Sequence, residues 1–291
     1  MTLNKAILAT LIYHDLFDYP LAIDEIQKYL ISRYASIKSI DSALKNLLSS
    51  KKVSRKGDYY FLFKRDLINK TRITRHRYSQ RKLKRARFYS QILKIIPSIK
   101  LLAVTGALAM ENSTKGDDID FMIVTAKNSL WTTRLLATLS LILFKRNPNS
   151  SRKANRACLN IFIEEEDLKI TDQNLYTAHE VIQVNVLWDR DNTYLKFIRA
   201  NNWVSKYLPN WKPEIVKQQY SNSDRKQKKA FRFSPLALVA ELYFKKIQLT
   251  YMHSKITSEK IGESQLFFHP KATQSDILKK YNQKLKKIKI S

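Results

Sequence analysis

Two acidic residues separated by a single residue carry the clearest chemical signal in the chain. Asp118 and Asp120 stand at the start of an apolar run, and this run predicts a strand over 119–124. Because successive side chains of a strand point to opposite faces, the two carboxylates project together, about 7 Å apart. Anions held that close repel each other unless a cation bridges them, and oxygen ligands at this spacing suit Mg²⁺. The alternative is a pair of solvated carboxylates that only cap the strand.

A glycine turn lies just upstream of the carboxylates. The apolar residues 101–104 predict a buried strand, and Gly106-Ala107 opens a short helix after it. Glycine lets the backbone approach a ligand, and the first N–H groups of a helix are free to bind phosphate. Lys115, in the polar loop before Asp118, completes the set of nucleotide-binding candidates. Carboxylates for magnesium beside a glycine turn for a triphosphate predict a site that transfers a nucleotide.

This stretch resembles the signature of a known family. Gly106-Ala107, ten further residues and then Asp118-Ile119-Asp120-Phe121 are similar to the glycine and Asp-x-Asp motif of the nucleotidyltransferase superfamily. That superfamily includes DNA polymerase beta, the CCA-adding and poly(A) polymerases, and small antibiotic- and antitoxin-type transferases. The resemblance covers roughly 100–165. It implies that Asp118 and Asp120 hold Mg²⁺ as catalytic residues, while Gly106 and the N–H groups after it hold the phosphates of an NTP.

Two positions differ from the family pattern. Ala107 stands where the family commonly has a serine whose hydroxyl contacts phosphate. The family also has a third carboxylate on a later strand, and the matching strand here, 156–163, has Asn160 as its polar inward position. Glu164 shares that face but lies about 13 Å further along the strand. An amide can ligate a hard cation, but it adds no negative charge and accepts protons poorly. Either the site works with two carboxylates, or it has kept binding and lost catalysis.

The rest of the chain predicts an α+β protein in four parts. Three amphipathic helices and two short strands around Gly57 fill 1–65, and this order resembles a winged helix-turn-helix. A basic connecting helix (66–98), a nucleotidyltransferase-like mixed sheet with helices (99–190) and a helical C-terminal region (191–291) follow. The winged-helix-like domain either places its third helix in the DNA major groove or serves only to dock a partner.

The connecting helix is crowded with positive charge. Like charges repel along a helix, so an anionic partner would relieve the strain. Arginine with interleaved aromatic residues suits phosphate and stacked bases, and the alternative is a solvated helix face that links two domains. The candidates for binding nucleic acid are Arg72, Arg75, Arg81, Arg85 and Arg87.

Composition narrows the classes of function. The 291 residues carry a net charge of +28, which makes polyanions natural partners, although a general drift toward lysine would also raise the charge. The single cysteine, Cys158, excludes an intrachain disulfide and a Cys-rich zinc site, and is most simply a small core residue. The most apolar segment, 135–144, is too short to cross a bilayer core of ~30 Å, so we expect a cytoplasmic protein without a membrane partner.

The expected function is therefore Mg²⁺-dependent transfer of an NMP from an NTP to an acceptor. Nucleic acid is the expected acceptor, with RNA and DNA both open, and a protein acceptor is the other candidate. Asn160 and Ala107 favour an alternative, a nucleic-acid-binding regulator that keeps the fold without turnover. A third alternative is an interaction protein whose winged-helix-like domain docks a partner.

Overall fold

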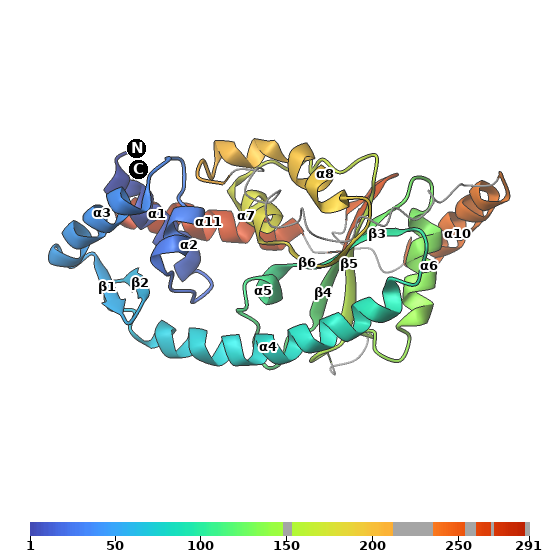
Figure 1. Ribbon diagram of the computed structural model, residues 1–291, viewed down its shortest axis with the longest axis horizontal. Coiled ribbons are helices and arrows are strands. Elements are labelled where there is room, and N and C mark those ends of the chain that lie inside the picture. Colours follow the sequence, from blue (N-terminus) through green and yellow to red (C-terminus); the bar gives the residue numbers. More distant parts are fainter. Residues whose placement is uncertain (148–152, 212–234, 254–259, 269–270, 289–291) are drawn as a thin grey trace.

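The computed structural model describes residues 1–147, 153–211, 235–253, 260–268 and 271–288. A small helical unit lies at one end of the molecule and a six-stranded mixed sheet at the other (Figure 1). A single long helix runs beneath both. The protein is thus of the mixed α+β class, as the sequence predicts. Among the described residues, no helix has the length and apolar character needed to cross a membrane.

The N-terminal unit contains three helices and a hairpin, in the order expected. Apolar residues of the helices, among them Ile7, Leu11, Ile40 and Leu44, are buried together. The hairpin turns at Gly57, whose φ of 60° lies in the left-handed region that glycine adopts without strain. The elements are α1 (Leu3–Asp15), α2 (Ile23–Lys28), α3 (Ile37–Ser49), β1 (Val53–Lys56) and β2 (Tyr59–Leu62).

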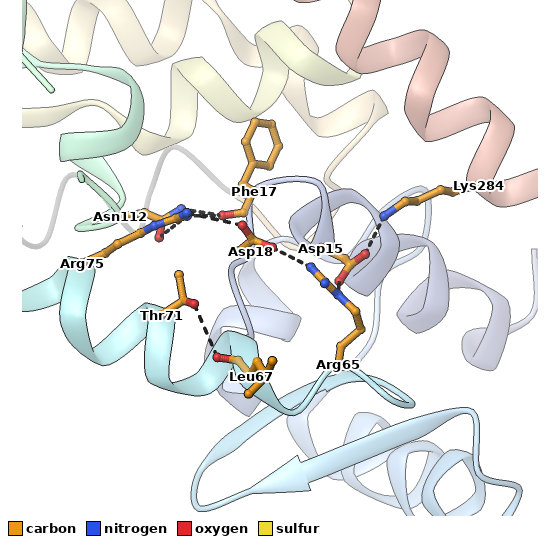
Figure 2. Close-up of polar contacts among 9 residues, drawn as sticks. All are labelled: Asp15, Phe17, Asp18, Arg65, Leu67, Thr71, Arg75, Asn112 and Lys284. Atoms are coloured by element: carbon orange, nitrogen blue, oxygen red, sulfur yellow. Dashed lines mark hydrogen bonds and ion pairs between the residues drawn. The ribbon is translucent and has the colours of Figure 1, made fainter. Parts of the chain in front are cut away.

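Helix α4 (Leu67–Leu93) joins this unit to the sheet and confirms the long helix expected from the sequence. Just before α4, Arg65 holds the chain to the N-terminal unit, because it donates to Asp15 of α1 at 2.6 Å and to Asp18 after α1 at 2.5 Å (Figure 2). Further along α4, its buried residues Leu83 and Leu93 pack against the sheet. One continuous helix therefore fixes the distance between the two ends of the molecule.

The sheet has the strand order β6-β3-β4-β5-β8-β7. β4 and β5 run parallel, whereas the other neighbouring pairs of described strands are antiparallel. β3 is buried along its whole length, as the apolar run 101–104 predicts, and Lys100 is buried with it. The bounds are β3 (Ile99–Val104), β4 (Ile119–Thr125), β5 (Ala157–Glu164), β6 (Asn185–Asp189), β7 (Lys260–Ile261) and β8 (Gln265–Phe267).

Alternate residues of β4 belong to two different cores. Phe121 and Ile123 pack in the core that also contains residues of α4 and α6, on one face of the sheet. Met122 and Val124 join the larger core, which also holds residues of α7, α8 and the N-terminal unit. Asp120 shares the parity of Met122, so it lies on the side of the sheet covered by α7.

The remaining helices surround the sheet and close the molecule. α11 packs back on α1, where Lys284 lies 2.6 Å from Asp15 (Figure 2). The ring of Tyr281 also meets that of Tyr13 edge-on. These helices are α5 (Gly106–Ala109), α6 (Leu130–Ser140), α7 (Leu175–Gln183), α8 (Thr193–Ala200), a 3₁₀ turn η1 (Asn202–Lys206), α10 (Pro235–His253) and α11 (Lys271–Lys287).

Residues beyond 190 are not purely helical, which differs from the sequence-based expectation. β7 and β8 extend the sheet, and β8 pairs with β5 from Ile161 to Ile163. The sheet therefore draws strands from outside the predicted 99–190 domain. Strands of two and three residues are too short to show an alternating pattern, because pairing with β5 rather than local propensity creates them.

Candidate metal and nucleotide site

Three potential ligand atoms converge where β4 and β5 begin. One oxygen each of Asp118 and Asp120 and the Sγ of Cys158 all lie within 4.8 Å of one another, and all three side chains are half-buried. The parallel pairing explains this, because Cys158 on β5 is directly opposite Asp120 on β4. The structure thus brings the two predicted carboxylates together and adds a thiol that the sequence analysis assigned to the core.

The glycine turn lies against this cluster. Gly106 has a φ of 61°, a conformation strained for other residues, and a Cβ at this position would lie 3.7 Å from Oδ2 of Asp120. The N–H of Thr105 donates to the Asp120 carbonyl oxygen at 3.1 Å and holds the turn to β4. Ala107 is exposed beside it. Helix α5 is only four residues long, so any phosphate contacts would come from the turn rather than from a long helix.

Arg146 neutralises part of the charge of the cluster. Its Nη1 donates to Oδ2 of Asp118 at 2.8 Å. Burial opposes ionisation of the guanidinium, but Asp118 outweighs it and the pKa of Arg146 is raised. Arg146 is brought here because the neighbouring Lys145 forms a bridge to Ala157, at the start of β5. The guanidinium therefore occupies part of the space around Asp118 where a metal ion would bind.

Helix α7 brings a further acid toward the carboxylates. Burial and the charge of Asp120 raise the pKa of Glu180 to about 7. The charge of Glu180, followed by burial and the charge of Asp120, raises the pKa of Tyr176, one turn earlier on the same helix. α7 contacts α5, so it faces the glycine turn as well. The sequence analysis missed both residues, because nothing near them in the sequence resembles a motif.

Asn160, the predicted third site residue, lies beyond the cluster. Phe121 pairs with Leu159 and Met122 with Ile161, so Asn160 is the extra residue of a β-bulge. Its side chain is almost fully buried, and its Nδ2 has no hydrogen-bond partner. The position level with Asp120 belongs to Cys158 instead. A catalytic part for Asn160 stays a prediction.

A buried lysine supports the loop that carries Asp118. Lys82 of α4 is 1% exposed, and its Nζ donates to the carbonyl oxygen of Asp117 at 2.5 Å and to Oδ1 of Asn155 at 3.1 Å. A longer contact of 3.4 Å reaches the carbonyl oxygen of Lys115. The side chain of Lys115 itself is exposed. Lys82 thereby ties α4 to the segments that precede both β4 and β5.

The arginines of α4 fall into two groups. Arg72 donates to both oxygens of Glu25, at 2.8 and 2.9 Å. Arg75 donates to the carbonyl oxygen of Phe17 at 2.8 Å and to Asp18 at 3.3 Å (Figure 2). These two predicted nucleic-acid ligands therefore hold α4 to the N-terminal unit. The other three are exposed, and no ion pair within the described residues engages them: Arg81, Arg85 and Arg87.

The donor set fits a hard divalent cation. Mg²⁺ is commonly held by one or two protein carboxylates, with water and substrate phosphates completing its shell, and Asp118 and Asp120 supply such a pair. Burial and then the charges of Asp120 and Asp118 raise the pKa of the Cys158 thiol, so at neutral pH it remains protonated. A protonated thiol is a poor ligand for Mg²⁺, which prefers oxygen. The two carboxylates are therefore the ligands that we assign.

Comparison with known proteins adds no assignment. No protein-family model matches the chain, and neither does any curated protein or solved structure.

Proposed function

We propose that this protein is a Mg²⁺-dependent nucleotidyltransferase that moves an NMP from an NTP to a nucleic-acid or protein acceptor. One observation carries the proposal. The carboxylates of Asp118 and Asp120 converge at the start of β4, and the left-handed turn at Gly106 lies against them. A metal–triphosphate complex needs neighbouring carboxylates that bind the metal and a backbone turn that can approach the phosphates closely.

Each residue of the site has a part in this scheme. Asp118 and Asp120 hold the metal, and Gly106 with Ala107 presents backbone N–H groups to the phosphates. When NTP binds, Arg146 exchanges Asp118 for a phosphate oxygen, since a guanidinium recognises both anions in the same geometry. Bound Mg²⁺ would lower the pKa of the acceptor hydroxyl and screen the charge that develops on the phosphates.

The transfer forms one bond, breaks one bond and releases one proton, which needs a single acceptor. The acceptor oxygen forms a bond to the α-phosphorus, and the bond from this phosphorus to the bridging oxygen of pyrophosphate breaks. Pyrophosphate leaves with the bonding electron pair. The hydroxyl proton passes to a carboxylate, and Glu180 is the one near Asp120 that the metal does not engage.

The N-terminal unit supports a winged helix-turn-helix assignment. Its three helices precede a basic hairpin, and Leu21 forms an isolated bridge with Tyr60, which adds a short third strand to the wing. Such a unit would present DNA or a protein partner to the rest of the molecule. A cytoplasmic location, where NTP and nucleic acids meet, fits this activity.

A second function is a binder that keeps the site without turnover. The observation that favours it is Cys158, a neutral thiol at the position level with Asp120 where a third acid would assist catalysis. The two functions differ in one outcome, because the binder holds metal and nucleotide but transfers nothing.

The deciding experiment is a transfer assay. Purified protein is incubated with Mg²⁺, each α-labelled NTP in turn, and cellular RNA, DNA or protein. We expect label in one acceptor class with wild type and none with Asp118→Asn/Asp120→Asn. The matched control, Glu166→Gln/Asp172→Asn, removes two solvent-exposed carboxylates of the same charge and should transfer like wild type. Absence of transfer with every NTP and acceptor would favour the binder, and transfer by the double Asn variant would contradict both functions.

A further inference from the structure

The outward face of α4 carries a row of cations that the fold does not use. Successive residues of a helix are rotated by about 100°, which places these side chains on one face over about 22 Å. All of them are exposed, and α4 contains no Asp or Glu. We call this row the basic track; it consists of Lys70, Arg77, Arg81, Lys84 and Arg85.

The cations on the inward face of the same helix have partners within the fold. Arg72 and Arg75 have carboxylate partners in the N-terminal unit, and Lys82 is buried against backbone carbonyl groups. No ion pair within the described residues engages a member of the basic track. Like charges one turn apart destabilise a helix. A row of five such cations is therefore best explained by an anion that binds along it.

The basic track joins further basic residues at its start and approaches the candidate site at its far end. At its start, Nδ2 of Asn69 donates to the carbonyl oxygen of Lys56 at 3.3 Å and joins α4 to the hairpin, where Arg55 and Lys56 are exposed. At its far end the track lies near the candidate site, because Lys82, three residues before Arg85 on α4, donates to the carbonyl oxygen of Asp117. Figure 1 shows α4 running from the hairpin to the underside of the sheet.

We infer that a nucleic acid binds with its phosphodiester backbone along the basic track, and that this places it to serve as the acceptor for the site at Asp118 and Asp120. The role of this nucleic acid as acceptor rests on the proposed function, whereas its binding along the basic track does not. Phe88, 54% exposed and one turn beyond Lys84, offers a ring for a base to stack on. Arg72 and Arg75 take no part in this binding.

The geometry favours nucleic acid over other anionic partners. A linear row of cations matches a linear polyanion, whose charges repeat along its length. A lipid surface would require a continuous apolar helix face next to the cations, but the exposed apolar residues of α4 near the track, Leu67, Ile73 and Phe88, are too far apart along the helix to form one. An acidic protein segment is the remaining competitor, and the experiment below includes it.

The test measures binding alone, without NTP or Mg²⁺, so its outcome is independent of the proposed transfer activity. Fluorescence anisotropy with labelled 20-nucleotide single-stranded RNA or DNA gives the affinity at several salt concentrations. The track variant is Arg77→Gln/Arg81→Gln/Arg85→Gln. The matched control, Lys196→Gln/Arg199→Gln/Lys206→Gln, removes three exposed cations from α8 and η1, on the other side of the sheet from α4 (Figure 1).

For wild type, the logarithm of affinity should fall linearly with the logarithm of salt concentration. Each lost phosphate contact reduces this slope by ~0.7 for single strands, so the track variant should lose ~2 from the slope. The control should keep the wild-type slope, and a preference for RNA or DNA would name the acceptor. Equal slopes for wild type and track variant, an equal loss in the control, or track-dependent binding of poly-glutamate in place of both nucleic acids would overturn the inference.

Discussion

Asp120 on β4 and Cys158 on β5 occupy paired positions on two parallel strands, with Asp118 and Arg146 beside them. The register between β4 and β5 therefore decides which side chain stands next to the carboxylates. That side chain is a neutral thiol, and the amide of Asn160 lies beyond it in a bulge. The site consequently has two carboxylates at the start of β4, a cation already paired to one of them, and a further acid on α7.

The first prediction separates Cys158 from Asn160. With Cys158→Asp, a third carboxylate joins the pair, so the variant should melt below wild type without metal and gain more from added Mg²⁺. Asn160→Asp places a charge in a buried bulge, so it should lower the melting temperature without changing the response to Mg²⁺. Melting curves with and without Mg²⁺ measure both effects, with Cys158→Ser as the neutral control. A larger Mg²⁺ response in Asn160→Asp than in Cys158→Asp would contradict our assignment.

The second prediction concerns Lys82. Replacing it by methionine removes the donor to Oδ1 of Asn155 and one of two donors to the carbonyl oxygen of Asp117, which keeps the N–H of Asn155 at 2.9 Å. An unsatisfied acceptor costs about 1–3 kcal/mol, so the free energy of unfolding in urea should fall by about 1–3 kcal/mol. Lys84→Met, two residues away and exposed, should change it by no more than about 0.5 kcal/mol. Equal effects of the two substitutions would show that the Lys82 contacts do not hold the loop.

The third prediction tests the structural part assigned to Arg72. Its guanidinium is 14% exposed, pairs with Glu25, and lies 4.1 Å from the ring centroid of Tyr19. Arg72→Met leaves the Glu25 carboxylate poorly solvated, which should destabilise the fold by about 2–4 kcal/mol, somewhat less than for a fully buried pair. Arg72→Met/Glu25→Gln should recover part of the loss in a double-mutant cycle. The salt slope for nucleic acid should stay at the wild-type value, and a reduced slope in the single variant would place Arg72 in the binding surface.

The fourth prediction is that two buried histidines lower the stability of the fold in mild acid. His14 and His179 are buried with ring centroids 5.3 Å apart, and each Nδ1 donates to the carbonyl oxygen four residues earlier. Burial lowers the pKa of His14 to about 4, with Glu25 and Arg72 acting on it in opposite directions. Burial, and then the proximity of His14, also lowers the pKa of His179. Both imidazoles are therefore neutral in the folded protein at neutral pH.

The sign follows from linkage. Below about pH 6.5 the unfolded chain protonates histidines that stay neutral in the folded protein, so these two groups lower stability as the pH drops toward 4, by up to about 1.4 kcal/mol per pH unit each. Glu164, Glu180 and Asp189 act in the opposite direction, because burial raises the pKa of each carboxyl and the folded protein binds its proton first. Urea denaturation at pH 7, 6 and 5 measures this slope. His179→Phe keeps a ring stacked on Tyr13, 4.0 Å away in wild type, and should remove the contribution of one histidine, up to about 1.4 kcal/mol per pH unit, from the slope. An equally steep slope in this variant would assign the acid sensitivity to other groups.

Features that depend on local interactions could be predicted from the sequence, whereas features that depend on long-range pairing could not. Local signals predicted the parts that local chemistry decides: the glycine turn, the paired carboxylates, the buried strand before them and the long α4. The register of β5 was beyond reach, because Cys158 and Asn160 have the same parity and only pairing shows which one stands level with Asp120. Short β7 and β8 were missed for the same reason.

The arginines of α4 show a second limit. Arg72 and Arg81 look alike in the sequence, yet one pairs with Glu25, 47 residues earlier, and the other is exposed. The approach of Glu180 to Asp120 also depends on how α7 packs on the sheet. Contacts over such separations are set by the tertiary fold, and a single sequence carries no local trace of them.

The central claim is that Asp118 and Asp120 jointly bind a divalent metal with NTP. The most direct measurement is the melting temperature of wild type and of Asp118→Asn/Asp120→Asn, each with and without Mg²⁺ plus NTP. A ligand at a hundred times its dissociation constant stabilises the folded state by about 2.7 kcal/mol, so wild type should melt several degrees higher with both ligands. The control Glu166→Gln/Asp172→Asn should show the same rise, and the site variant none. An equal rise in the site variant would mean that the metal and nucleotide bind elsewhere, and the account would be wrong.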